Sequence, residues 1–133
     1  MDHMRVALDL RVPEAGHSHD AVFAPFLRSV AEERLVIAYF DGSGGLIDLH
    51  LSEGQRASIS FPLRRIVQSA LAADAAAVML AHNHPSGDTR PSLADREMTR
   101  KLAAALRPLD IRLIDHLIFA GEDVAGFRAL GLL

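Results

Sequence analysis

Residues 81–95 read AHNHPSGDTRPSLAD, and this stretch decides more about the chain than any other. Side chains on a β-strand alternate between faces with a period of two, so His82 and His84 point the same way if they end a strand. The Pro- and Gly-containing residues 85–91 predict a turn that brings Asp95 back toward the histidines. Two histidines and one aspartate leave a fourth tetrahedral position open, as in catalytic zinc sites. The spacing therefore predicts a hydrolytic zinc site.

The pattern His-x-His-Pro-x6-Ser-x2-Asp resembles the JAMM motif of JAB/MPN-domain metallohydrolases. The residues around it, Leu80 to Asp88 and the run LIDHLI at 113–118, resemble the RadC branch of that superfamily. The resemblance extends from about Glu33 to Leu133. It implies an α/β fold of the JAB/MPN-like (cytidine-deaminase-like) type, in which a mixed, curved β-sheet is flanked by helices.

The resemblance also implies a role for each candidate residue. Glu33, just before an apolar run, would be the general base that accepts a proton from metal-activated water. Glu32 stays an alternative because it is one residue away. Ser92 would donate a hydrogen bond to the oxyanion, and it also fits a helix N-cap; the two roles are compatible. The ligands of one Zn²⁺ per chain would be His82, His84 and Asp95.

Two further ionisable residues, Asp115 and His116, lie in the apolar run of residues 111–119. Ionisable groups inside a buried strand need partners. They would either hydrogen-bond to a ligand histidine and orient it, or form a local hydrogen-bonded pair with a structural role. The sequence leaves both readings open.

Together these features predict a zinc metallopeptidase or isopeptidase-like hydrolase, with a peptide or protein as substrate. One alternative is a noncatalytic JAB module that binds a protein partner. Another is a DNA-repair accessory protein, suggested by the family name alone. The net charge of −3 and the scattered basic residues lack the footprint of a nucleic-acid-binding surface. The adjacent pair Arg64 and Arg65 fits the solvent side of an amphipathic helix.

The composition fits one small domain, since half of the 133 residues are hydrophobic. The chain contains no cysteine, which excludes disulfides and thiolate metal sites and suits a reducing compartment. No stretch is long enough to predict a membrane-spanning helix, and the N-terminus lacks the pattern of a signal peptide. We therefore expect a cytoplasmic protein without a membrane partner.

Residues 1–20 are polar and broken by Pro13 and Gly16, which predicts an N-terminal extension before a domain at 21–133. A second His-x-His, from His17 to His19, lacks the Pro-Ser-Asp register and is expected to be solvated. Leu71 and Leu93 are expected on the buried faces of their helices. Strands are predicted at 35–40 and 46–51, joined as a hairpin, and at 56–61, 75–82 and 111–119; helices are predicted at 21–32, from Pro62 onward, and at 92–107.

Overall fold

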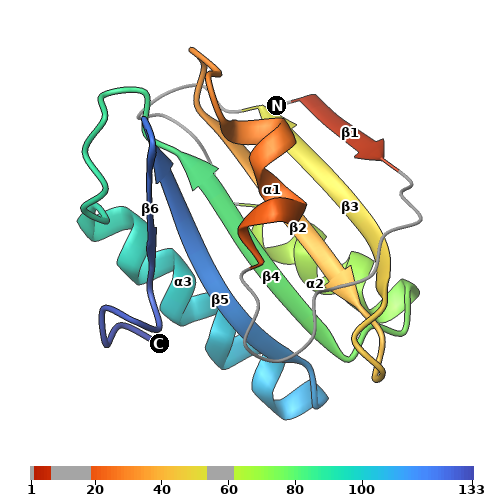
Figure 1. Cartoon of the computed structure of the whole chain (residues 1–133). Coiled ribbons are helices and arrows are strands. Elements are labelled where there is room, and N and C mark those ends of the chain that lie inside the picture. Colours follow the sequence, from red (N-terminus) through yellow and green to blue (C-terminus); the bar gives the residue numbers. More distant parts are fainter. Residues whose placement is uncertain (1, 7–18, 54–61) are drawn as a thin grey trace.

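The computed structural model describes residues 2–6, 19–53 and 62–133. Within these ranges, six strands form one sheet in the order β1-β3-β2-β4-β5-β6, with α1 on one face and α2 and α3 on the other (Figure 1). None of the described helices is both long and apolar enough to cross a membrane. The elements are β1 Asp2–Val6, α1 Asp20–Leu27, β2 Arg34–Phe40, β3 Leu46–Glu53, α2 Leu63–Ala72, β4 Ala77–Asn83, α3 Leu93–Leu106, the 3₁₀ helix η2 Arg107–Leu109, β5 Arg112–Ala120 and β6 Asp123–Gly126.

The sheet is mixed. Strands β4 and β5 are parallel because α3 carries the chain back between them, and every other neighbouring pair is antiparallel. The predicted hairpin of β2 and β3 is present. Its turn is fixed by the carboxylate of Asp41, which accepts hydrogen bonds from the backbone of Ser43 and Gly45. This mixed sheet flanked by helices confirms the predicted α/β fold class.

Two apolar clusters fill the space between the layers. On the α1 side, Phe23 packs with sheet residues such as Met79 and Phe119. On the other side, Ile66 of α2 and Leu102 of α3 pack with a second set of sheet residues. Alternation along β4 divides its side chains between the clusters. Met79 and Ala81 face α1, whereas Val78 and Leu80 face α2 and α3.

Two predictions about burial are wrong. Leu71 is 54% exposed and Leu93 is 64% exposed. A helix turns by about 100° per residue, so Leu93 lies about 200° from Asp95, on the side away from the sheet. Leu71 follows buried Ala70 by one residue, which places it beyond the edge of the buried stripe of α2. The sheet-facing row of α3 instead contains Thr99, which is 1% exposed.

Several element boundaries also differ from the prediction. Helix α1 ends at Leu27 because the next residue is extended and Ser29 has a left-handed φ of 59°. Strands β1 and β6 were not predicted, and β1 pairs with β3 although it lies within the predicted N-terminal extension. The strand predicted at 56–61 lies outside the described residues, as does most of the His-x-His segment at 17–19.

Candidate metal centre

The predicted ligand atoms converge at the end of β4. The Nε2 atoms of His82 and His84 are 2.8 Å apart. The Asp95 Oδ2 atom, at the start of α3, lies 3.4 Å from His82 Nε2 and 3.3 Å from His84 Nε2. His82 is buried, and the other two residues are partly buried. The sequence motif thus becomes a compact group of two nitrogens and one oxygen.

The spacing of these three atoms suits a single metal ion. A triangle with these sides has a circumscribed circle of about 1.8 Å radius. A point about 0.9 Å outside its plane is therefore about 2.05 Å from all three atoms, which is the usual length of zinc–nitrogen and zinc–oxygen bonds. The three atoms can therefore contact one ion from the same side and leave its other side open for another ligand.

The capping box at the start of α3 fixes the position of Asp95. Ser92 is the N-cap, and its Oγ accepts a hydrogen bond from the Asp95 amide at 3.0 Å. In return, Asp95 Oδ2 accepts from the Ser92 amide at 2.9 Å. That same Oδ2 atom faces the histidines, so the helix cap and the candidate ligand are one arrangement. The hydroxyl proton of Ser92 is not used in the capping box.

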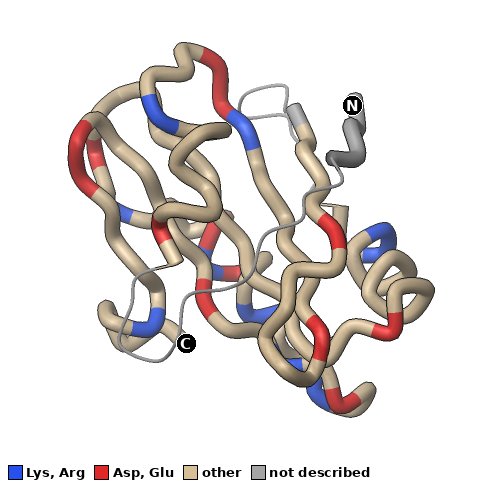
Figure 2. Tube along the Cα trace, turned by 45° about the vertical axis from the view of Figure 1, so that its right-hand side comes forward, with Lys and Arg blue, Asp and Glu red and all other residues tan. Residues whose placement is uncertain are grey.

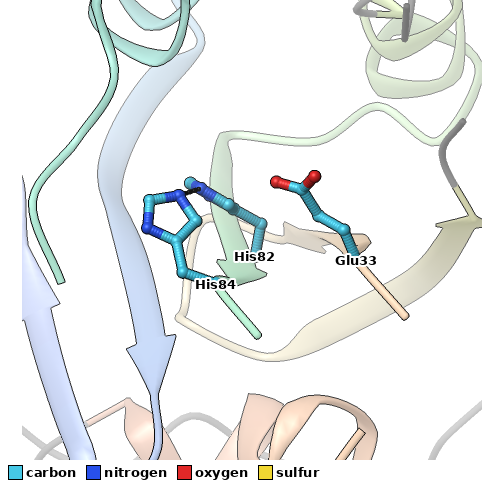
Figure 3. A group of neighbouring side chains, drawn as sticks. All are labelled: Glu33, His82 and His84. Atoms are coloured by element: carbon cyan, nitrogen blue, oxygen red, sulfur yellow. Dashed lines mark hydrogen bonds between the residues drawn. The ribbon is translucent and has the colours of Figure 1, made fainter. Parts of the chain in front are cut away.

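Glu33 approaches the histidines from the segment that leads into β2. Glu33, His82 and His84 each offer a ligand atom within 4.8 Å of the others. Figure 3 shows the Glu33 carboxylate directed toward the two imidazoles. The neighbouring Glu32 is exposed, and its carbonyl accepts a hydrogen bond from Asn83. The structure thus brings Glu33 to the site, in the register that the sequence favoured.

The hydrogen bond of His84 determines which of its nitrogens faces the site. Its Nδ1 lies 2.7 Å from the carbonyl oxygen of Asp88. A carbonyl can only accept, so Nδ1 must carry the hydrogen. When the imidazole is neutral, its Nε2 therefore presents a lone pair to the candidate metal position.

His82 is oriented by a longer chain of hydrogen bonds, which we call the relay: Thr99, His116 and His82. Thr99 Oγ1 donates to the Asp95 carbonyl at 2.6 Å, so it must accept at its 2.7 Å contact with His116 Nδ1. Burial lowers the pKa of His116 well below its ordinary value, so this ring is neutral. Its Nε2 consequently accepts from His82 Nδ1 at 2.7 Å. The remaining lone pair of His82, on Nε2, faces the site.

With the hydrogens placed in this way, two lone pairs face one another at 2.8 Å, an arrangement that a cation between them would stabilise. Without a metal, a proton can take that place. Accordingly, the hydrogen bond with Asp95 raises the pKa of His84, although burial opposes the shift. Burial on its own would raise the pKa of Asp95, but the hydrogen bonds with His82 and His84 lower it. The geometry and both shifts describe a site that is stabilised by positive charge.

The structure separates the roles of Asp115 and His116. A register shift between β4 and β5 places His116 opposite Leu80, so its ring joins the α3 side of the sheet and contacts His82. The Asp115 carboxylate instead binds backbone groups: its Oδ1 accepts from the amides of His116 and Arg128. It fixes the segment after β6. His116 therefore touches a candidate ligand, whereas Asp115 supports the backbone.

Sequence reasoning missed two residues around the site. Thr99 completes the relay, and its signal was its position four residues after Asp95, on the same side of α3. Asn83 is buried, and its side-chain amide contacts the segment that carries Glu33. Its signal was its place between the two histidines, where strand alternation points it to the opposite face.

A candidate metal-binding group at a strand end of a mixed sheet fits a JAB-type α/β domain, and the comparisons specify the family. The chain belongs to the RadC-like JAB domain family, whose model matches residues 16–132. A UPF0758 protein of Bordetella petrii is 45% identical over 112 residues, which is 84% of this chain and 50% of that protein. Two relatives come from Escherichia coli K12. UPF0758 protein YfjY is 42% identical over 80% of this chain and 68% of its own length. UPF0758 protein YkfG is 38% identical over 96% of this chain and 85% of its own length. The chain thus spans half of the Bordetella relative and most of YkfG.

Proposed function

We propose that the chain is a zinc-dependent hydrolase of the JAMM type that cleaves an amide bond in a peptide or protein substrate. The observation that carries this proposal is the pair of imidazole lone pairs directed at one point beside the Asp95 carboxylate. Glu33, a second carboxylate, lies close enough to act on a water molecule there. These are the parts that metal-assisted hydrolysis requires.

His82, His84 and Asp95 would hold the ion. When bound, zinc lowers the pKa of a water ligand toward neutrality and polarises a carbonyl group. Glu33 would take the proton of the attacking water at a carboxylate oxygen and later deliver it to the leaving nitrogen. The Ser92 hydroxyl proton would be donated to the substrate oxygen as negative charge develops on it. Each residue thus has one task, and none of these tasks disturbs the hydrogen bonds of the relay.

Metal analysis tests the site directly. Protein purified without a metal-affinity step should contain about one zinc per chain, since the ligand set is complete within the domain. The variant His82→Ala should lose the ion but keep its circular dichroism spectrum, because the sheet and both apolar clusters do not depend on it. Zinc bound at other residues, or none at saturating zinc, would contradict the assignment.

A comparison of two neighbouring glutamates tests the chemistry. Glu33→Gln should retain zinc but lose hydrolysis of quenched fluorescent peptides or a lysine-linked isopeptide, by roughly a hundredfold or more. Glu32→Gln is the matched control and should behave like the unmodified protein, because its side chain is exposed. If zinc binds and no amide substrate is cleaved, the noncatalytic module that binds a protein partner becomes the better explanation.

A protein or peptide substrate also agrees better than nucleic acid with the charges of the described surface. Figure 2 shows basic and acidic positions interspersed along the chain. A nucleic-acid-binding surface would need basic residues gathered along a phosphate path. The cytoplasm is the location we propose, on the basis of the cysteine-free sequence.

A further inference from the structure

We propose that Asn83 is a positioning residue that holds Glu33 toward the metal site. This inference rests on the proposed function, in which Glu33 moves a proton. Asn83 is the residue between the two candidate ligands, yet its side chain lies on the other face of β4. It therefore cannot act as a ligand alongside them, and its contacts must explain its presence.

The side-chain amide of Asn83 is 3% exposed and binds both sides of Glu33. Its Oδ1 accepts from the backbone amide of Arg34 at 2.6 Å. Its Nδ2 donates to the carbonyls of Glu32 at 2.8 Å and Val30 at 3.1 Å. Two of these hydrogen bonds thus fix the backbone immediately before and after Glu33, and the third holds Val30, three residues before it.

These contacts extend the association of β2 with β4 beyond the end of their backbone pairing. The last paired residues of β2 and β4 are Leu35 and His82. Beyond them, the Asn83 side chain supplies the acceptor for the Arg34 amide. The β2 register is thereby continued toward Glu33, two residues before Leu35 and hence on the same face as His82. One strand end consequently presents the imidazoles and also fixes the carboxylate that faces them (Figure 3).

The chemistry of the contacts requires asparagine in particular. The side chain must accept from one amide and donate to two carbonyls, which an amide group can do. Aspartate has the same shape but only accepts, so it would keep the Arg34 contact and set its second oxygen against the carbonyls of Val30 and Glu32. Asn83→Asp therefore breaks two of the three hydrogen bonds at constant size, and Asn83→Ala breaks all three.

Cobalt(II) provides a test that needs no substrate, because its visible absorption reports on the groups around the ion. We would compare the cobalt spectra of the unmodified protein, Glu33→Gln, Asn83→Ala and the double variant. The alanine variant should bind cobalt within a few-fold of the unmodified affinity and reproduce the spectral change of Glu33→Gln. The double variant should show no further change, because Asn83 acts only through Glu33. On a cleaved peptide, kcat should fall about a hundredfold with KM unchanged.

Met79→Ala is the matched control, since Met79 is buried on the same face of β4 and belongs to the α1-side cluster. It should lower thermal stability without altering the cobalt spectrum. If Asn83→Ala fails to fold, Asn83→Asp is measured in its place. An Asn83 variant with an unmodified spectrum, or one whose change persists in full when Glu33 is already glutamine, would overturn the inference alone. Failure to bind cobalt, or undiminished peptide cleavage by Glu33→Gln, would overturn the proposed function and this inference with it.

Discussion

Replacing Thr99 by valine removes one hydroxyl from the relay at almost constant volume. In the metal-bound protein, His82 must keep its hydrogen on Nδ1, and His116 must therefore keep its hydrogen on Nδ1 as well. The valine variant leaves that His116 donor buried without an acceptor. When no metal is bound to Thr99→Val, His82 and His116 can each move their hydrogen from Nδ1 to Nε2, so that no donor is left unpaired beside residue 99. The substitution therefore penalises the metal-bound state more than the metal-free state.

The size of the effect follows from the cost of one buried, unpaired donor, which is about 1–3 kcal/mol. Because about 1.4 kcal/mol corresponds to a tenfold change in a binding constant, zinc affinity should fall by about 5- to 150-fold. This range overlaps the roughly 10- to 100-fold loss that is typical when a partner of a ligand histidine is removed. Thr99→Ser keeps the hydroxyl and should retain most of the affinity.

Competition with a chelating dye of known zinc affinity measures the effect, with Thr99→Ser as the matched control. Long-range proton–nitrogen NMR spectra of the imidazoles provide a second measurement. In the zinc-loaded protein, they should place hydrogens on Nδ1 of both His82 and His116. Unmodified zinc affinity in Thr99→Val would refute the relay. An equal loss in both variants would also refute it, since it would attribute the effect to disturbed packing at residue 99 rather than to the loss of the hydroxyl.

Two further predictions concern stability. In the presence of a chelator, the free energy of unfolding should be highest near pH 6.5. Below that pH, the unfolded chain takes up a proton at His116 that the folded protein excludes, because burial lowers the pKa of His116. Above that pH, His84 contributes less to stability, because the hydrogen bond with Asp95 raises its pKa in the folded protein and this stabilisation is lost as pH rises through that pKa. A melting temperature that only rises or only falls between about pH 5 and pH 8.5 would contradict this prediction. Gly126→Ala should destabilise the fold by about 1–3 kcal/mol, because an added Cβ would lie 2.9 Å from Asp115 Oδ2. Gly42→Ala is the control: no atom lies within 4 Å of its added Cβ, so its melting temperature should change little.

The convergence of the candidate ligand atoms could be predicted from the sequence because each part of the group is local. His82 and His84 share a face through the two-residue period of a strand. Ser92 and Asp95 are tied by a capping box, which depends only on a spacing of three residues. A turn between the two parts then brings them together. Several elements were predictable for the same reason, since the glycine-rich turn of the hairpin, the apolar stripes of α2 and α3 and the continuous apolar run of β4 are each local features of the sequence.

The surroundings of the ligands could not be predicted in the same way, because they depend on pairing between distant segments. Regular alternation would put Leu113 and Asp115 on one face of β5, with His116 on the other. The register shift against β4 reverses this order and turns His116 toward His82. A sequence period cannot show where such a shift occurs. Thr99 was missed because a buried threonine in a helix is unremarkable until the ring beside it is known.

The charges of the site explain why a divalent ion suits it. The relay and the Asp88 carbonyl keep both imidazoles neutral when their lone pairs bind an ion. The carboxylates of Asp95 and Glu33 then balance the two positive charges of the ion, so a partly buried site carries no net charge. If a proton shared by His82 and His84 takes the place of the ion, its single positive charge leaves one of the two carboxylates uncompensated. Magnesium has the right charge but prefers six oxygen ligands, whereas two nitrogens at these distances suit zinc. In the proposed reaction, a proton that Glu33 took from water would stay inside the same group, so the total charge that the site must bury would not change.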